Sequence, residues 1–381
     1  MKRIAAVTAA VVVAVTTALL LPASAAARQS DPVRLLTHES FAVSQDVLDA
    51  FTVETGYPVV ILTGGDAGQI VNQAILAAGN PVADVLFGVD TTFLSRALDG
   101  GVFEAYESPG LGVVPPGLRA DPRVTPIDIG DVCLNYDKAA FVTVPPPQTL
   151  DDLTDPAYAG MLVVENPATS SPGLAFLLAT IARFGESGDY TWQDYWADLR
   201  RNGVAVTQGW EEAYYGSFSG GSGEGDRPLV VSYASSPAAE VVFATEPTAT
   251  APTGVITDGC FHQVEYAGIL AGTTNRAGAE ALIDFMLSDA FQEDVPLNMF
   301  VFPASTEARL PDVFVAHAAV PAEPETVAPA AIEQNRERWV DEWTAIVLRD
   351  PSGTRWGVIG ASIAAVAVLA FGGWRFRRRR R

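Results

Sequence analysis

Short apolar runs alternate with helical patterns over residues 33–90, and this alternation limits the fold more than any other feature of the sequence. The segments VRLLT, YPVVILTG and ADVLFGVD predict strands, whereas SQDVLDAFTVETG and GDAGQIVNQAILAAGN predict helices, the second capped by Asp66. This order indicates a parallel sheet covered by helices, an α/β architecture. Ligands of such sheets bind beyond the C-terminal strand ends, where THESF, GGDAG and GVD lie.

The chain between its two hydrophobic ends is too long for one core, so two lobes are expected. Residues 128–141 predict an extended crossing followed by a short helix, and a Pro-rich, acidic segment then leads into the second lobe. There MLVVENP, GVAVTQGW, LVVSYASSP and FHQVEYAGIL predict strands, and TSSPGLAFLLATIARFG predicts a loop and a long helix. Residues 275–295 and 330–349 predict amphipathic helices.

Residues 1–27 have the pattern of a secretory signal peptide. Lys2 and Arg3 precede an apolar run and a stretch of small residues, so cleavage is expected near Ala25 or Ala27. The alternative is an uncleaved membrane anchor.

Residues 356–374 predict a transmembrane helix. The segment 357–373 carries no charge, Trp356 and Trp374 flank it, and six Arg follow it. We therefore expect a single-pass protein of the cell membrane, with residues 375–381 as a cytoplasmic basic tail and the main part outside the cytoplasm.

The part outside the cytoplasm is strongly acidic. Eight of the 24 basic residues lie in the two terminal segments, which leaves 16 against 45 acidic ones, a net charge of −29. Such a charge repels nucleic acid and favours a small cationic ligand, although it also promotes solubility alone.

Catalytic and metal-binding patterns are weak. The three histidines, His38, His262 and His317, are scattered, and the HExxH, GxSxG and SxxK motifs are missing. We expect neither an enzyme nor a cofactor. In an oxidising compartment the two cysteines, Cys133 and Cys260, favour a disulfide, with two buried thiols as the alternative.

Three segments carry candidate ligand contacts. In TSSPGLAFLL, Ser170 and Ser171 either cap the helix or bind an oxygen-bearing ligand. TQGWEEAYYGSF and LVVSYASSP follow strands, so the rings of Trp210, Tyr214 and Tyr233 could stack on a flat cation, with core packing as the alternative. Asp66 or Asp90 of the first lobe could balance the charge of the cation. Together, the candidate ligand contacts from these segments and from the first lobe are Ser170, Ser171, Trp210, Tyr214, Tyr233, Asp66 and Asp90.

In this order and spacing, TSSPGLAFLL, TQGWEEAYYG and LVVSYASSPAAE resemble the periplasmic thiamine-binding proteins of ABC transporters. ADVLFGVDTTFL, YDKAAF and RERWVDEW are similar to the same family, so the resemblance extends from about residue 33 to residue 349. It implies a two-lobed, class II periplasmic-binding-protein fold that closes on thiamine, its monophosphate or its diphosphate. It also implies delivery to an ABC permease and its ATPase, by a monomer without catalytic chemistry.

The resemblance also implies a domain organisation and a set of ligand contacts. Residues 28–132 would form the first part of lobe 1, residues 133–264 lobe 2, residues 265–349 the return to lobe 1 with the C-terminal helices, and residues 350–355 a linker. Cys133 and Cys260 would lie beside each other in the interlobe crossings and form a disulfide. The implied ligand contacts are Trp210 and Tyr233 as aromatic walls, Tyr214 nearby, Asp66, Ala67 and Gly68 as the acidic first-lobe contact, and Ser170 and Ser171 at the hydroxyethyl or phosphate end.

Two positions depart from the family pattern. His38 stands where the family has a tyrosine in its first loop, and Phe300 stands where the family has an indole. Phe300 keeps a ring but loses the strongest cation–π partner. A binding protein of the same fold for ferric iron or a polyamine, and a membrane-tethered sensor, are the alternatives.

Overall fold

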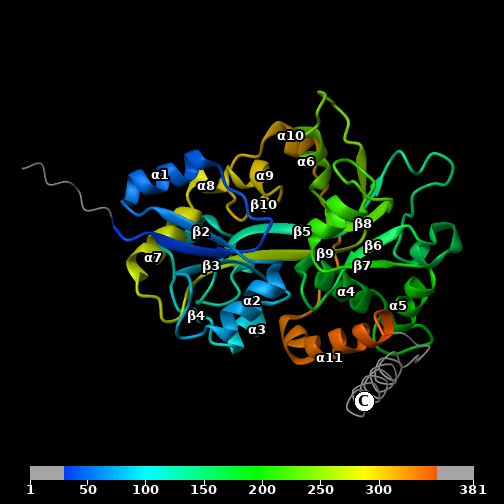
Figure 1. Ribbon diagram of the computed structural model, residues 1–381, viewed down its shortest axis with the longest axis horizontal. Coiled ribbons are helices and arrows are strands. Elements are labelled where there is room, and N and C mark those ends of the chain that lie inside the picture. The colour runs from blue at the N-terminus through cyan, green and yellow to red at the C-terminus, as the bar shows by residue number, and fades with distance from the viewer. Residues whose placement is uncertain (1–29, 350–381) are drawn as a thin grey trace, which may run out of the picture.

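A computed structural model describes residues 30–349, in which ten strands form one sheet (Figure 1). The predicted signal peptide (1–27), linker (350–355), transmembrane helix (356–374) and basic tail (375–381) lie outside the described residues. The strands are β1 (Val33–Thr37), β2 (Val59–Thr63), β3 (Val85–Asp90), β4 (Phe103–Glu104), β5 (Thr125–Asp137), β6 (Leu162–Glu165), β7 (Ala205–Thr207), β8 (Leu229–Tyr233), β9 (Thr253–Leu270) and β10 (Phe302–Pro303).

Helices cover both halves of the sheet (Figure 1). The α-helices are α1 (Gln45–Thr55), α2 (Ala67–Leu76), α3 (Leu94–Asp99), α4 (Ser171–Phe184), α5 (Trp192–Arg201), α6 (Ser236–Val242), α7 (Arg276–Met286), α8 (Asp289–Gln292), α9 (Val295–Asn298), α10 (Asp312–His317) and α11 (Pro329–Val347). Short 3₁₀ turns are η1 (Pro109–Val113), η2 (Pro116–Leu118), η3 (Asp151–Thr154) and η4 (Pro156–Tyr158), and η5 (Glu212–Ser217) is π-helical.

The first lobe confirms the predicted alternation of strands and helices. Strand β1 pairs in parallel with both β2 and β3, and α1 and α2 are the two connecting helices. Helix α1 begins after Ser44, whose hydroxyl accepts from Val47 N, and ends at Gly56 in the left-handed conformation. Asp66 caps α2, as its position in the sequence predicts.

The second lobe repeats the parallel arrangement with β6 between β8 and β7. Helix α4 follows β6, and its N-cap is Ser170, whose hydroxyl accepts from Gly173 N. A capping box at Thr191 and Asp194 begins α5. Strand β7 ends at Thr207 and strand β8 at Tyr233, so the segments that follow them open on the same edge of the sheet.

Two long antiparallel strands, β5 and β9, join the lobes. β9 pairs with β3 in the first lobe, β5 pairs with β8 in the second, and the two strands pair with each other from Thr125–Ala267 to Asp137–Thr253. A disulfide joins Cys133 of β5 to Cys260 of β9. The sheet continues through both lobes without a break, so it does not mark where one lobe ends and the other begins. The lobe boundaries at residues 132 and 264 therefore stay predictions.

Two predicted helices differ from the structure. The segment after β5 is a turn, because the Asp137 carboxylate accepts from Ala139 N and offers the backbone a local alternative to a helix. The helix predicted over residues 275–295 is broken between α7 and α8, where the Ser288 hydroxyl accepts from Phe291 N and starts a new helix.

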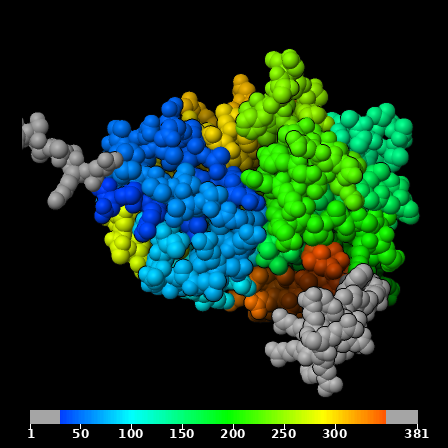
Figure 2. Space-filling model, viewed as in Figure 1, coloured from blue at the N-terminus to red at the C-terminus, as the bar shows by residue number. Residues whose placement is uncertain are grey.

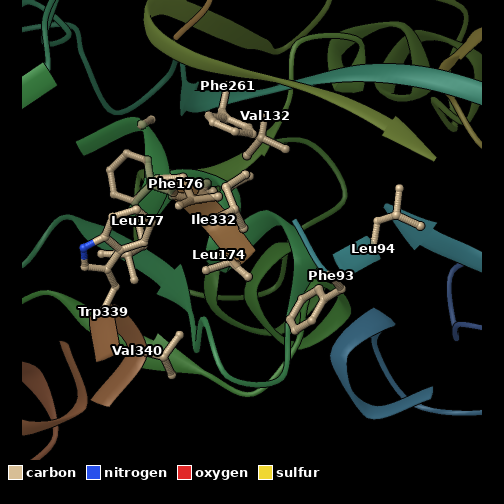
Figure 3. Close-up of a cluster of buried hydrophobic side chains, with 14 of the residues drawn as sticks. Phe93, Leu94, Val132, Leu174, Phe176, Leu177, Phe261, Ile332, Trp339 and Val340 are labelled. Atoms are coloured by element: carbon tan, nitrogen blue, oxygen red, sulfur yellow. The ribbon is translucent and has the colours of Figure 1, made fainter. Parts of the chain in front are cut away.

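Helix α11 packs beneath both lobes, against α3 in the first and α5 in the second (Figure 2). Trp339 and Trp343 are almost fully buried, and Ile346 packs on the same cluster, so their predicted common face is a packing face. Figure 3 shows residues of α11 beside those of α4, namely Ile332, Trp339 and Val340 beside Leu174, Phe176 and Leu177. Within residues 30–349, none of the helices combines the length and the apolar character that a membrane span needs.

The disulfide should stabilise the fold measurably, because it closes a loop with a sequence separation of 127 residues. Reduction should lower the free energy of unfolding by about 2–5 kcal/mol, mainly by freeing the unfolded chain. Urea unfolding with and without a reductant measures the difference. The Cys133→Ser/Cys260→Ser double variant is the control and should not respond to the reductant; equal unfolding midpoints for the oxidised and reduced wild type would contradict the expectation.

Candidate functional site

A cavity of about 480 Å³ lies between the lobes, at the strand ends where the sequence predicts ligand binding. The first lobe contributes residues 38–42, after β1, and the start of α2. The second lobe contributes the start of α4 and the segment from the end of β8 into α6, together with Trp210, Glu211, Tyr214 and Tyr215. Residues 298–301 and Glu265 of β9 complete the wall.

His38 enters the cavity because Gly88 leaves room for its ring. Gly88 has φ +105° at a register shift in β3, and a Cβ there would lie 2.4 Å from His38 Cδ2. His38 Nε2 lies 3.3 Å from Glu265 Oε1. Burial lowers the pKa of His38, but the attraction of Glu265 outweighs burial, so the pKa is raised. The imidazole is thus partnered by a carboxylate of the same cavity.

Asp66 connects the two lobes through hydrogen bonds. Its Oδ1 accepts from Ala67 N (2.6 Å) and, across the cleft, from Ser171 N (3.4 Å). Its Oδ2 accepts from Trp210 N (3.0 Å), also in the second lobe. A further interlobe bond runs from Gly68 N to the Thr169 carbonyl (3.0 Å). The carboxylate of the first lobe therefore positions the backbone of the second.

The aromatic wall is built on the π-helical segment η5. Trp210 stacks on Tyr214, with ring centroids 5.0 Å apart and an interplanar angle of 20°, and Tyr215 meets both rings edge-on. Trp210 Nε1 donates to Ser232 Oγ (2.9 Å) and the Tyr214 hydroxyl donates to Glu240 Oε1 (2.8 Å). Both rings are held in place by hydrogen bonds at their polar ends, so the stacked pair forms a fixed aromatic surface at the cavity.

Tyr233 and Phe300 also line the cavity. Gly130 lets Tyr233 lie over β5, because a Cβ at this position would lie 2.9 Å from Tyr233 Cδ1. Phe300 has φ +56°, which is unusual for an aromatic residue, and its ring lies 5.2 Å from that of Phe243. The Ser235 hydroxyl donates to the Phe300 carbonyl, so the surrounding structure holds this strained residue in place.

A row of three carboxyl groups crosses adjacent strands beside the cavity. Asp90 of β3 and Asp128 of β5 are both in register with Glu265 of β9, which lines the cavity. Burial raises the pKa of Asp90 to about 6, against hydrogen bonds from Ser171, Gln263 and Thr92 that lower it. Burial and the Glu265 carboxylate raise the pKa of Asp128 well above its usual range.

The cavity is electrostatically one-sided. Five carboxylates line it, and neither Lys nor Arg is among the lining residues. Burial raises the pKa of Glu39, and the neighbouring charges of Glu211 and Asp66 raise it further. Such a site attracts positive charge and repels anions. The lining carboxylates are Glu39, Asp66, Glu211, Glu240 and Glu265.

The structure brings most of the predicted contacts together. The predicted residues that line the cavity are His38, Asp66, Ala67, Ser171, Trp210, Tyr214, Tyr233 and Phe300. Three others lie behind the wall. Gly68 packs against the Thr169 carbonyl, Asp90 is fully buried and accepts from Thr92 Oγ1, and Ser170 is fully buried as the cap of α4.

Sequence reasoning missed several lining residues. Glu39 lies beside His38 and could have been found from the predicted loop after the first strand. Glu240 and Glu265 gave no signal, since Glu240 lies beyond the predicted strand LVVSYASSP and Glu265 lies inside the predicted strand FHQVEYAGIL. Ser222 comes from the Gly-rich segment 219–228, and its hydroxyl donates to Glu240 (2.9 Å). In the described residues, groups of three or more His, Cys, Asp or Glu that could hold a metal ion are not found.

Residues 80–341 match the model of the bacterial extracellular solute-binding protein family. The chain belongs to this family. It is 30% identical over 332 residues to the thiamine-binding periplasmic protein of Brucella suis, which covers 85% of this chain and 94% of the relative. Members of the family are transport proteins without enzymatic activity, so the expected lack of catalysis is confirmed by membership.

Solved structures agree with the two-lobed periplasmic-binding-protein fold. A periplasmic thiamin binding protein has a TM-score of 0.74 and 27% identity, over 83% of this chain and 96% of the other. Iron-bound HitA from Pseudomonas aeruginosa shares the fold, with a TM-score of 0.66 and 20% identity over 83% and 99% of the two chains.

The predicted single-pass membrane localisation is corrected by these comparisons, since the relatives of this solute-binding protein are periplasmic.

Replacing Asp90 by Asn should stabilise the solute-binding protein more as the pH rises. With a pKa of about 6 in the fold and an ordinary one near 3.8 when unfolded, Asp90 binds more proton in the folded state. The free energy of unfolding of the wild type therefore falls as the pH rises through this window. Asn does not ionise, so the variant does not show this fall. The advantage of Asp90→Asn should grow by about 2 kcal/mol between pH 4.5 and 7.5.

Urea unfolding at the two pH values measures this difference in the free energy of unfolding. The control is Asp226→Asn, at a carboxylate whose side chain is 97% exposed, which should show a pH-independent difference from wild type. An Asp90→Asn advantage that is constant or shrinks with pH would show that Asp90 is ionised in the fold throughout.

Proposed function

We propose that this solute-binding protein captures thiamine outside the cytoplasm and delivers it to the permease and ATPase of an ABC importer. The observation that carries the proposal is a cavity with stacked aromatic rings and five carboxylates, in which Lys and Arg are not among the lining residues. Thiamine is a flat, positively charged molecule with two rings. The names of relatives that cover most of the chain support the same ligand.

The aromatic wall suits a planar cation better than a flexible one. A thiazolium ring against Trp210 would gain stacking and cation–π attraction of about 0.5–2 kcal/mol. The rings of Trp210 and Tyr214 are already parallel, so little side-chain entropy is lost when a third ring joins the stack. Tyr233 and Phe300 line the same cavity and would limit the space for the second ring of the ligand. A polyamine, with many rotatable bonds, gains less from such walls.

Ferric iron is disfavoured by the tyrosines that would have to bind it. Iron ligation needs phenolates, but burial and Glu240 raise the pKa of Tyr214 well above its usual range. Burial and the charges of Glu211 and Glu240 also raise the pKa of Tyr215. Both phenols therefore lose their protons less readily, which makes ligation of the metal less favourable.

Capture would proceed by closure of the lobes about β5 and β9. With the lobes apart, the aromatic wall of the second lobe and the carboxylates of the first face water. Closing forms the hydrogen bonds from Ser171 and Trp210 to Asp66 and shields the ligand from water. Interactions between a cation and carboxylates are stronger in such a low-dielectric space.

Trp210→Ala should weaken thiamine binding by about tenfold or more, because it removes one face of the stack. Isothermal titration calorimetry of the purified protein measures the dissociation constant. Tyr190→Ala is the matched control, since Tyr190 lies before α5 and away from the cavity, and its affinity should equal that of wild type. No heat with thiamine, unchanged affinity in Trp210→Ala, or tighter binding of spermidine than of thiamine would contradict the proposal.

A further inference from the structure

His38 places a side chain that can carry a positive charge inside a cavity suited to a positively charged ligand. Among the cavity-lining residues of the described part of the chain, it is the only one that can become cationic. Its side chain is 14% exposed, and its Nε2 atom lies 3.3 Å from Glu265 Oε1. Nε2 is buried and makes no hydrogen bond within residues 30–349, so the contact depends on charge and not on an aligned hydrogen bond.

Negative charge faces His38 from three elements. Glu265 lies on β9, Asp66 lies at the start of α2, and Glu39 follows His38 in the loop after β1. Burial lowers the pKa of His38, but the charges of these three carboxylates outweigh burial and raise it. On the side of β3 the ring packs against Phe87, with ring centroids 5.7 Å apart, and this neighbour brings no charge. Without a bound cation, the cavity therefore favours the imidazolium form.

Three further titratable groups lie around Glu265. Asp90 of β3 and Asp128 of β5 are in register with it, and Tyr233 of β8 lines the same cavity. Burial raises the pKa of Asp128 and Tyr233 well above their usual ranges, which favours their neutral forms, and raises the pKa of Asp90 to about 6. Asp90 and Asp128 are not among the lining residues, so a ligand in the cavity meets His38 and Glu265 first.

We propose that His38 sets the charge that the cavity accepts, because a cationic ligand replaces the imidazolium charge beside Glu265 and its capture releases a proton from His38. An N–H bond of the imidazolium breaks, the electron pair stays on the ring nitrogen, and the proton passes to the solvent. The ligand brings one positive charge and the proton removes one, so the cluster keeps its net charge. The inference rests on the proposed function, since it takes thiamine as the cation.

The expected pH dependence has a definite sign. A bound cation lowers the pKa of a neighbouring imidazole, so protonation of His38 opposes binding. The affinity should rise as the pH rises through the range in which the unliganded protein loses this proton, and it should level off above that range. The tyrosine that the family has in place of His38 would not behave in this way, because an unperturbed phenol titrates near about pH 10 and stays neutral near pH 7.

Calorimetric titration of the purified protein with thiamine, in two buffers of different ionisation enthalpy, counts the protons released. The wild type should release about 0.3–1 proton per thiamine near neutral pH, and its association constant should rise at least about twofold between about pH 6.5 and pH 8. In His38→Gln both effects should nearly disappear. His262→Gln is the matched control, because His262 Nδ1 lies 2.9 Å from Asp131 Oδ1 but His262 is not among the lining residues, and it should keep the wild-type proton count.

The outcomes separate the inference from the proposed function. Tight thiamine binding without proton release, or with proton uptake, overturns the inference and leaves the proposed function standing. Proton release at the wild-type level in His38→Gln identifies another source, such as Asp128, and overturns the role of His38. The absence of thiamine binding by the wild type overturns both. If His38→Gln does not fold, as judged by circular dichroism, His38→Tyr, which keeps a ring at this position, takes its place.

Discussion

The pairing of β5 with β9 is the constraint on which the rest of the molecule depends. These two strands run through both lobes, and every other strand of the sheet is built outward from them, β3 and β4 from β9 and β8 from β5. The Cys133–Cys260 disulfide joins them in the second half of β5. The pairing therefore fixes which loops of the first lobe face which loops of the second, and so determines the composition of the cavity.

The cavity concentrates negative charge that a folded protein would normally avoid. Isolated buried carboxylates are costly, and here each has a partner or a raised pKa: Asp66 accepts three backbone N–H groups, Glu265 meets His38, and burial raises the pKa of Asp90 and Asp128. The remaining repulsion among these carboxylates destabilises the empty cavity, and a bound cation relieves it. An anionic ligand would add to the repulsion, so the same arrangement of charge favours the binding of cations and disfavours the binding of anions.

Much of this fold could be predicted from local patterns. The strand and helix runs of residues 33–90, the cap at Asp66 and the buried face of the last helix follow from periodicity and capping chemistry, which act between neighbours in the chain. The break at Ser288 was not predicted, because the apolar pattern continues across it and only the serine hydroxyl marks a new start.

The site was predicted less completely, for a physical reason. Trp210, Tyr214 and Tyr233 carry distinctive side chains at strand ends, so both their residue types and their places pointed to a cavity. Glu240 and Glu265 lie on regular elements and become cavity residues only through tertiary packing. The role of Ser170 as a buried cap likewise depends on the direction of one hydroxyl, which sequence cannot give.

The most direct test of the account compares thiamine with a neutral analogue in which the ring nitrogen that carries the charge is replaced by carbon. The two molecules have nearly the same shape, so a difference in affinity measures the attraction between the cavity and the positive charge. If the carboxylate-lined cavity selects a cation, thiamine should bind at least about tenfold more tightly at low salt. Equal dissociation constants for the two molecules would contradict the central claim.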